Sequence, residues 1–482
     1  MSRTGTGAII ALNAIGKQDQ ILYNLDNYNT CDSPFYSDHK RISHYTKFYK
    51  SYVRNGPSGS LTWPFTGSGD KVGFIIDPRI SGDLLTNVFL KIDLPAITTS
   101  TWTDKIGRAI IQSVEFRVDN IIVEKLTDMD LIFKDEIFTT EHDNTVRNYC
   151  QNGRLYTNSL TEEDYLNNPP VLSISPDHNR SALKLYINLG FCFGRTHSYK
   201  PEAFPLAAIG KQNVYIDIQF RPKSWFTGTD DLVYTDKVTL VTEQITLTDQ
   251  ERIFLRHKPF SIKYKTVEKR QSVQTDKDAD TFSQTGIASG SVDQLTTKLN
   301  NTRPVSLIGW FFQNRRFLNI ESGDSINTSN LYLNRYNFGS HENFSNINPL
   351  VDGYIEPYYG FNEDNFPLCA QIELLSDKTD LKLLYTGSDA KTIPSTSVFF
   401  RDILSQSKGL YRPVKNIFTY SFEESPLSPT ENGSAKDSIS NYKLFNVLIN
   451  NDEVLSNVYD INIYNVCYTT LNFEGGELVK KI

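Results

Sequence analysis

The sequence predicts an all-β protein, and two observations carry this prediction. The 482-residue chain contains 26 Tyr and 29 Phe but only 2 Met, and aromatic residues fit the half-buried surface of a sheet better than they fit a helix. Apolar and polar residues also alternate with period two in segment after segment, as in antiparallel sheets with one buried face. Helical periodicity is scarce, which favours β-sandwiches or barrels with long excursions.

The clearest strand pattern lies in residues 214–221, where alternate positions are apolar. One face of this segment carries Val214, Ile216, Ile218 and Phe220. We expect further strands wherever the same alternation recurs, in residues 88–94, 114–119, 260–265, 418–422 and 459–465. Each of these strands would bury one face and expose the other.

Two helices are expected. The longer one covers residues 123–138, because four apolar residues recur there at helical spacing beside acidic and basic ones. These four residues are Leu126, Met129, Phe133 and Ile137. A shorter helix is expected to begin near Thr161, where three acidic residues follow in the first turn, a position that the helix dipole favours.

The chain is too long for one ordinary core, so we expect two domains or a few. The strand-like residues 237–247 give way to a polar stretch, which predicts a domain boundary within residues 246–258. The predicted division is an N-terminal arm of residues 1–30, a first domain of residues 31–247 and a second domain of residues 248–482.

Two polar stretches of the second half are predicted to be loops. Residues 266–302 are poor in large apolar side chains, and residues 321–366 are rich in Asn, Ser, Gly and Tyr. A loop as long as the second one is typically functional or exposed to a partner.

Charge and cysteine content exclude several classes of protein. The net charge is −7, so the chain lacks the excess of Lys and Arg that contact with phosphate requires, and we expect no direct nucleic-acid binding. The cysteines are far apart and odd in number, which predicts reduced thiols rather than a disulfide framework or a zinc site. They are Cys31, Cys150, Cys192, Cys369 and Cys467.

The N-terminus gives no sign of a targeting segment. Residues 7–15 are apolar, but Asn13 interrupts them and no convincing cleavage site follows, so we expect neither a signal peptide nor a membrane-spanning helix. The predicted site of synthesis is the cytoplasm.

Enzymatic motifs are missing where they would be expected. Gly16-Lys17 and Gly210-Lys211 lack the surrounding residues of a phosphate-binding loop, and no Gly-x-Ser-x-Gly elbow occurs. The seven histidines show no metal-ligand spacing; they are His39, His44, His142, His178, His197, His257 and His341. We therefore predict no catalytic, cofactor-binding or metal-binding residues, and no cofactor.

We expect no functional role for the paired carboxylates or for the glycosylation motifs. Glu162-Glu163-Asp164 and Glu423-Glu424 are expected on a solvated surface. The Asn-x-Ser/Thr sequences are expected in ordinary polar loops; they begin at Asn179, Asn300, Asn327, Asn343 and Asn432.

Eight segments match one family of proteins in the order of that family. They are Gly7–Leu12 with Gly16–Asp19, Ile42–Lys50, Arg79–Leu84 with Leu94-Pro95, Leu185–Ile187 through Phe204–Leu206, Asp249–Arg252, Val305–Asn314, Tyr420–Phe422 with Pro426, and Asn462–Tyr464 with Gly475-Gly476. Each match is weak alone, but together they cover almost the whole chain. The chain resembles the major capsid proteins of the nucleocytoplasmic large DNA viruses.

The resemblance implies a fold, a function and partners. The implied fold is a double jelly roll, that is, two eight-stranded antiparallel β-barrels with one or two short helices and long loops. The implied function is that of a structural, non-enzymatic protein of the virion, which forms pseudo-hexagonal homotrimeric capsomers of an icosahedral shell. Its implied partners are neighbouring capsomers, minor capsid proteins and the inner virion membrane.

The chain also departs from the family pattern. Asp119-Asn120 stands where the family has Gly-Gly, and Asp130 stands where it has Trp. Such departures keep a second interpretation open, that of a minor capsid protein or a divergent double jelly-roll paralogue. A third interpretation, from a different class, is a β-sandwich carbohydrate-binding protein, since jelly rolls also host lectins.

Overall fold

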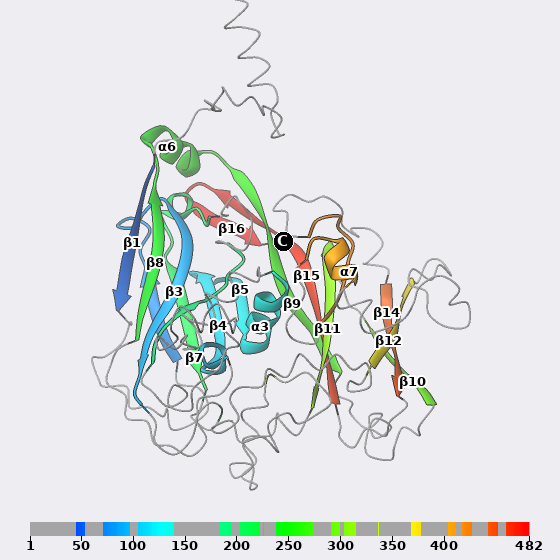
Figure 1. Ribbon diagram of the computed structural model, residues 1–482. Coiled ribbons are helices and arrows are strands. Elements are labelled where there is room, and N and C mark those ends of the chain that lie inside the picture. Colours follow the sequence, from blue (N-terminus) through cyan, green and yellow to red (C-terminus); the bar gives the residue numbers. More distant parts are fainter. Residues whose placement is uncertain are drawn as a thin grey trace, which may run out of the picture.

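The structure is a computed structural model in which β-strands predominate (Figure 1). It describes residues 45–53, 71–96, 105–138, 183–193, 203–221, 225, 238–273, 291–298, 303–314, 336, 368–376, 403–410, 417–426, 442–451 and 459–481.

The first eight strands form two four-stranded antiparallel sheets, ordered β1-β8-β3-β6 and β2-β7-β4-β5. The strands are β1 Thr46–Val53, β2 Lys71–Ile76, β3 Leu84–Leu94, β4 Ile111–Val118, β5 Ile121–Thr127, β6 Leu183–Asn188, β7 Val214–Phe220 and β8 Val238–Thr246. The first strand pairs with the eighth, the second with the seventh, the third with the sixth and the fourth with the fifth. This nested pairing is that of a jelly roll.

The second half repeats the pattern. Its strands are β9 Phe260–Val273, β10 Ser291–Lys298, β11 Val305–Asn314, β12 Leu368–Ser376, β13 Phe418–Ser421, β14 Tyr442–Asn451, β15 Tyr459–Glu474 and β16 Glu477–Lys481. One sheet joins β9, β15, β11 and β13, as β1, β8, β3 and β6 are joined in the first roll. The other sheet, β10-β14-β12, corresponds to β2-β7-β4. Seven of the eight jelly-roll strands thus recur among the described residues, and β16 extends the end of β15.

Helices are short and few in the described part of the chain. They are α2 Ile106–Ala109, α3 Asp128–Ile137, the 3₁₀ helix η1 Leu206–Ile209, α6 Asp249–His257 and α7 Leu404–Ser407. None of these described helices has the length and apolar character needed to cross a bilayer. The expected all-β double jelly roll is confirmed.

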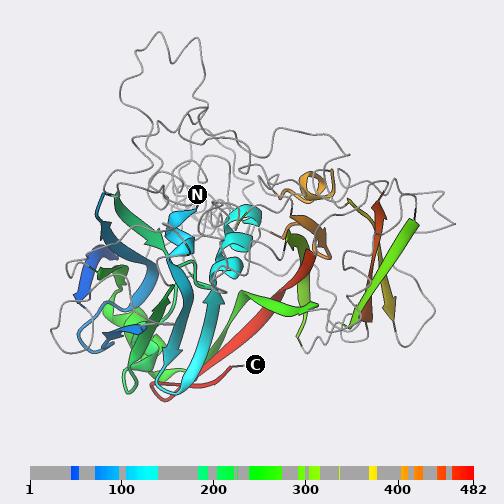
Figure 2. The same cartoon turned by 90° about the horizontal axis from the view of Figure 1, so that it is seen from below.

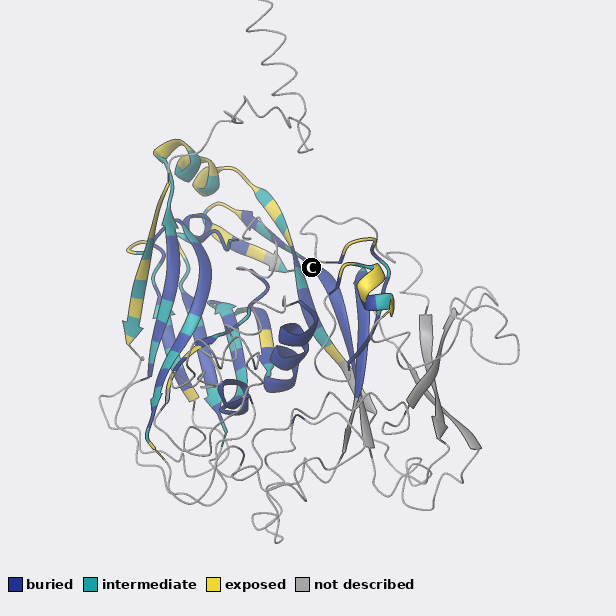
Figure 3. Ribbon diagram, viewed as in Figure 1, coloured by how far each residue is buried: buried dark blue, intermediate teal, exposed yellow. Residues whose placement is uncertain are grey.

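The period-two alternation builds the core of the first roll. In β2, residues Val72, Phe74 and Ile76 are buried, and they lie opposite the buried positions Ile218, Ile216 and Val214 of β7. Phe116, Phe191, Phe193 and Phe204 then fill the space between the two sheets, with ring centroids about 5 Å apart in several pairs. Figure 3 shows buried residues along most strands of these two sheets and throughout α3, whereas β1 and α6 are intermediate or exposed.

The helix expected over residues 123–138 is only partly correct. Its C-terminal end agrees with α3, but residues 123–127 belong to β5, which pairs with β4 across the turn at Asp119-Asn120. Thr127 ends the strand and caps the helix, because its side chain accepts a hydrogen bond from the Asp130 amide. Leu126 therefore faces the core from a strand, and its spacing from Met129 is fortuitous.

The turn at Asp119 explains one departure from the family pattern. Asp119 has φ 45°, in the left-handed region where glycine is favoured and Asp is tolerated. Its side chain accepts a hydrogen bond of 3.0 Å from the Asn213 amide, which ties the turn to β7. At this turn the aspartate has less conformational freedom than a glycine, but its side chain forms a hydrogen bond that glycine could not form.

The loop predicted over residues 266–302 is wrong in two places. Strand β9 continues to Val273, and β10 covers residues 291–298. Small polar residues can occupy a strand when the partner strand satisfies them, and Thr266 is buried with its hydroxyl 2.7 Å from that of Thr469 on β15.

Several predictions lie outside the described residues: the arm of residues 1–30, the helix near Thr161, and the loop of residues 321–366 except Tyr336. The limits of the two domains stay a prediction.

Candidate functional site: the junction of the two jelly rolls

The junction between the two rolls is the most elaborate polar assembly of the described structure. The contacts at this junction fix the placement of one roll against the other. Among the described residues, no group of three or more His, Cys, Asp or Glu side chains is placed to hold a metal ion. The site consists of the contacts that cross between the rolls and of the contacts that support them.

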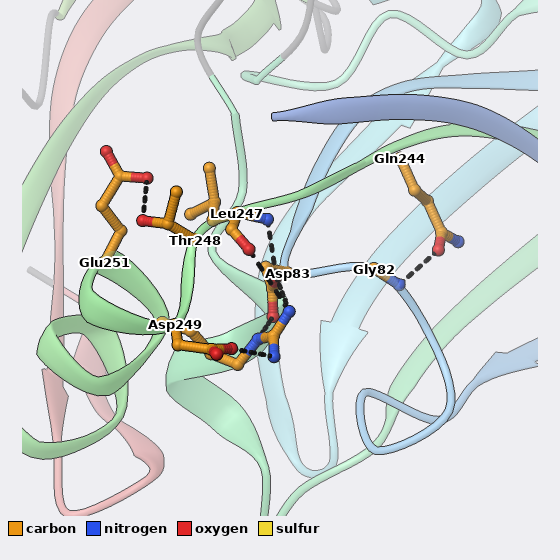
Figure 4. A network of polar contacts seen from close by, with 8 residues as sticks. Gly82, Asp83, Gln244, Leu247, Thr248, Asp249 and Glu251 are labelled. Atoms are coloured by element: carbon orange, nitrogen blue, oxygen red, sulfur yellow. Dashed lines mark hydrogen bonds and ion pairs between the residues drawn. The ribbon is translucent and has the colours of Figure 1, made fainter. Parts of the chain in front are cut away.

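The first contact joins Asp83, which immediately precedes β3, to Arg252 on helix α6. The two charged groups form a bidentate pair, with Nε 2.8 Å and Nη2 3.0 Å from the two carboxylate oxygens. The Leu247 amide donates a further hydrogen bond of 2.8 Å to the Asp83 carboxylate (Figure 4). Residues 169 positions apart are thereby fixed at the point where the chain leaves the first roll.

The backbone around Asp83 is held as firmly as its side chain. The Asp83 amide donates to the Ile245 carbonyl at 2.8 Å, and its carbonyl accepts from the Ala207 amide at 2.9 Å. Next to it, the Gly82 amide donates to the Gln244 side chain at 2.7 Å (Figure 4). A Cβ on Gly82 would come within 3.0 Å of both the Gln244 Cβ and the Ile245 carbonyl oxygen, so this position admits only glycine without rearrangement.

Electrostatics strengthen the ion pair of Asp83 and Arg252, which we call the clamp. The carboxylate of Asp83 is buried, and its hydrogen bonds to the Arg252 guanidinium raise the pKa of that arginine above its ordinary value. Arg252 also bonds Asp249 at 3.0 Å within the first turn of α6. Bidentate Arg–carboxylate pairs of this kind fix direction as well as distance, so the clamp orients α6 on the first roll.

The second contact is helix α3, which lies between the strands of the first roll and strands β9 and β15 in both views (Figures 1 and 2). All ten of its residues are buried. Its Phe133 ring stacks on Tyr464 of β15 at 4.8 Å, and Tyr464 in turn stacks on Phe311 of β11 at 5.6 Å. Gly309 makes this approach possible, because a Cβ there would overlap the Phe133 ring.

A helix buried on all sides must satisfy its charged residues inside the protein. Asp135 of α3 receives a bidentate pair from Arg108 at 2.7 and 2.9 Å. Three further ion pairs complete the set: Arg221–Asp128 at 2.7 Å, Lys134–Glu124 at 3.3 Å and Lys105–Glu136 at 3.3 Å. Tyr336 also donates to Asp128 at 3.0 Å. Such pairs add little net stability, but losing one partner is costly, so they fix the orientation of the helix.

Asp130 is the charged residue of α3 whose protonation the structure perturbs most clearly. Burial raises its pKa from 3.8 to about 6, although hydrogen bonds from the amide and hydroxyl of Thr127 act in the opposite direction. One of its carboxylate oxygens is buried with no hydrogen-bond partner. The neighbouring Tyr464 is fully buried, and its pKa is raised by burial and by the nearby carboxylates.

The C-terminal hairpin makes the third contact. The Leu478 amide donates to the Gln212 side chain at 2.7 Å, beside η1 of the first roll. Lys481 donates to the Val123 carbonyl at 2.5 Å. Gly475 and Gly476 both have positive φ at the turn between β15 and β16, which lets the chain fold back over the first roll.

The structure tests some of the residues that the sequence singled out. Glu423 was expected on a solvated surface, and this expectation is wrong: its side chain is fully buried, 2.7 Å from the Lys265 ammonium and hydrogen-bonded to Tyr468. Lys265, on strand β9 and 158 positions earlier in the chain, satisfies the charge, and sequence spacing does not reveal that pairing. Its neighbour Glu424 is exposed, as expected.

Cysteines and histidines play no visible part in the junction. Among the described residues, Cys192 and Cys467 are buried and form no disulfide, and His257 ends α6. The other histidines, the Asn-x-Ser/Thr sequences and the acidic run at residues 162–164 lie outside the described residues, as do Cys31 and Cys150.

The resemblance pointed to both halves of the clamp but not to the charges of α3. Asp83 and Arg252 each lie in a segment that carries the family resemblance, and the structure brings them together. Arg108 and Lys105 gave no signal, because isolated basic residues in a short helix look like surface residues. Only the partner Asp135, 27 positions further on, makes Arg108 a buried residue.

Two rolls of the same strand order in one chain, locked by a buried junction, define a double jelly-roll protein. Residues 65–255 match the family described as the major capsid protein N-terminus. No curated protein sequence matches the chain.

Solved structures share this fold over nearly the whole chain. PBCV-1 VP54 is similar with a TM-score of 0.62 and 15% identity, over 92% of this chain and 98% of its own. The Faustovirus major capsid protein is similar with a TM-score of 0.59 and 11% identity, over 97% of this chain and 98% of its own. The family match over residues 65–255 and the shared fold over nearly the whole chain confirm the resemblance to the major capsid proteins of large DNA viruses.

Proposed function

We propose that this chain is the major capsid protein of its virion, and that it self-assembles into homotrimeric capsomers that tile an icosahedral shell. The observation that carries the proposal is the repeat of one nested strand order, in β1–β8 and again in β9–β15. Two similar rolls in each of three copies give six similar units around one axis. Such a trimer has a pseudo-hexagonal outline and can pack in a hexagonal lattice.

The junction supports the proposal because a ring of six units closes only if the angle between the rolls of one chain is fixed. Asp83 with Arg252, α3 against β15, and Gln212 with Leu478 are three separate contacts between the first roll and the chain that follows it. Three separate contacts restrain both hinge and twist between the rolls. Chains free to hinge would form open assemblies as readily as closed ones.

The proposal includes the domains, the partners and the location of the chain. The arm of residues 1–30, the first roll of residues 31–247 and the second roll of residues 248–482 are its domains. Its partners are neighbouring capsomers, minor capsid proteins and the inner virion membrane, after assembly in the host cytoplasm. The net charge of −7 supports a shell protein without direct contact to the genome. The proposal assigns no catalytic step to the chain.

The test is the mass of the purified full chain by light scattering, with negative-stain images of the same peak. We expect three chains of 54.9 kDa in one particle with a hexagonal outline. A stable monomer at micromolar concentration would overturn self-assembly into trimers. The copy number in purified virions separates a major from a minor capsid protein, since the major protein outnumbers every other shell component.

A further inference from the structure

Helix α3 carries five charged side chains into the junction, and one of them lacks a counter-charge. Four have an oppositely charged partner: Asp128 pairs with Arg221, Lys134 with Glu124, Asp135 with Arg108 and Glu136 with Lys105. The fifth, Asp130, forms no ion pair among the described residues, although only 5% of its surface is accessible. A buried carboxylate without a counter-charge is costly, and binding a proton removes that cost.

The hydrogen bonds of Asp130 leave a place for such a proton. Its Oδ2 atom accepts hydrogen bonds from the Thr127 amide at 2.6 Å and from the Thr127 hydroxyl at 2.8 Å, as part of the capping box that begins α3. Its Oδ1 atom is buried and has no hydrogen-bond partner. A proton on Oδ1 therefore neutralises the carboxyl group and leaves the capping box intact.

The groups that face Asp130 come from α3 itself and from two strands of the second roll. Lys269 of β9 favours the charged form of the carboxyl group, whereas Asp128 of α3 disfavours it. Tyr464 of β15 is fully buried beside both carboxylates. The positive charge of Lys269 and the hydrogen bonds from Thr127 offset burial only in part, so the pKa of Asp130 is raised to about 6.

Asp130 lies where the two rolls meet. Helix α3 separates the strands of the first roll from β9 and β15 (Figures 1 and 2), and one turn after Asp130 the Phe133 ring stacks on Tyr464 at 4.8 Å. Local opening of this contact lets water reach the Asp130 carboxyl group. A charged Asp130 therefore favours opening, and a neutral one opposes it.

We propose that Asp130 is a pH-sensitive switch of the junction, which closes the contact of α3 with β9 and β15 more firmly in mildly acidic surroundings. Between pH 7 and pH 5 the carboxyl group of the closed form changes from mostly charged to mostly neutral, so the equilibrium constant for local opening falls by about tenfold. Asp130 stands where the family pattern has Trp, which cannot take up a proton in this way. The switch acts within one chain and does not depend on the proposed trimer.

The test is hydrogen exchange of the full chain, followed by mass spectrometry at pH 7 and pH 5 and corrected for the intrinsic exchange rate. In the wild type we expect the protection of backbone amides in β9 and β15 to rise by about tenfold at pH 5. Strand β1, at the end of its sheet and away from α3 (Figures 1 and 2), is the internal reference and should not change. Equal protection of β9 and β15 at the two pH values would overturn the proposal without any variant.

The Asp130→Asn variant tests the assignment to this residue. Asparagine keeps an oxygen for the Thr127 amide and cannot ionise, so we expect the protection of β9 and β15 to be the same at both pH values. Two controls should keep the wild-type response. Glu424→Gln removes an exposed carboxylate, and His257→Gln removes a side chain of the type that ordinarily changes charge in this pH range. A wild-type response in Asp130→Asn, or its loss in either control, would assign the switch to another group.

A second variant avoids any change inside the junction. Lys269 is exposed on β9, and its charge favours the ionised form of Asp130. In Lys269→Gln we expect the midpoint of the change in protection to move to higher pH than in the wild type. An unchanged or lower midpoint would show that Asp130 is not the group that titrates.

Discussion

The two corresponding sheets, β1-β8-β3-β6 and β9-β15-β11-β13, share strand order and differ in what covers their outer faces. The second-roll sheet presents Tyr464 to Phe133 of α3, and Leu307 is buried in the same core. The first-roll sheet presents Tyr49, Val53 and Tyr186 to solvent, with Glu243 held among polar partners. One topology therefore carries two kinds of surface.

The two outer faces differ in composition because one of them is covered within the chain. A face covered within the chain is never exposed in the folded protein, so it can be wholly apolar. An outer sheet face in contact with water carries a mixture of apolar and polar groups. Glu243 shows this mixture: burial raises its pKa, but hydrogen bonds from Thr86, Lys47 and Asn87 outweigh that effect and lower it overall.

The largest predicted effect is at the covered face. We expect Phe133→Ala to lower the free energy of unfolding by about 3–5 kcal/mol, because it empties a tightly packed aromatic contact with Tyr464. Urea unfolding measures the change. The same substitution at an exposed aromatic residue, Tyr49→Ala, is expected to cost much less.

A double-mutant cycle sharpens this prediction. Gly309→Ala alone should destabilise the chain, because the added Cβ overlaps the Phe133 ring. In the Phe133→Ala background the same change should cost little, which gives a favourable coupling. Additive effects of the two substitutions would mean that these residues do not meet.

A smaller effect is expected at the clamp. Arg252→Ala should lower the free energy of unfolding by about 2–4 kcal/mol, because it leaves the buried Asp83 carboxylate without its bidentate partner. Arg252→Lys keeps the charge but loses the fork, so an intermediate cost is expected. If Arg252→Ala unfolds at the wild-type urea concentration, the clamp does not hold the rolls together.

The pH dependence of stability gives a third effect. The folded-state pKa of Asp130 is raised to about 6, so the folded chain binds a proton that the unfolded chain releases. Stability should therefore rise as pH falls, by about 1 kcal/mol between pH 7 and pH 5. Asp130→Asn should remove this increment. The window lies above the range in which Glu243, whose pKa is lowered, gains a proton and loses stabilising hydrogen bonds. An unchanged pH profile in Asp130→Asn would assign the dependence to another group.

The smallest effect on stability is predicted at the open face. Val53→Asp with Tyr186→Asp should change the free energy of unfolding of the monomer by about 1 kcal/mol at most, because Val53 is largely exposed and Tyr186 is half-exposed. Thermal melts at concentrations below the assembly threshold measure it. A loss comparable to that of Phe133→Ala would show that this face is already packed within the chain, which would erase the contrast between the two sheets.

Much of this fold was predictable from the sequence. Alternation identified β7, β4 and the start of β9, because each has one buried face. It failed at residues 123–127, where a strand and a helix adjoin and their apolar residues happen to continue one helical spacing. It failed again over residues 266–302, since polar residues such as Thr266 occupy a strand only because β15 satisfies them.

The junction was predictable only in part. Asp83 and Arg252 lie in segments that carry the family resemblance, but nothing local shows that they meet. The partners of the buried ion pairs of α3 lie on other elements of the first roll; they are Lys105, Arg108, Glu124 and Arg221. A charged residue is usually at the surface, so the burial of the five charged side chains of α3 follows from tertiary structure and not from their types; they are Asp128, Asp130, Lys134, Asp135 and Glu136.

The most direct measurement is a cryo-electron microscopy map of the purified, self-assembled chain. We predict a particle with threefold symmetry in which six jelly rolls surround one axis, with α3 between the two rolls of each chain. A particle in which the first rolls of two copies meet face to face, or in which the angle between the rolls varies from chain to chain, would contradict it.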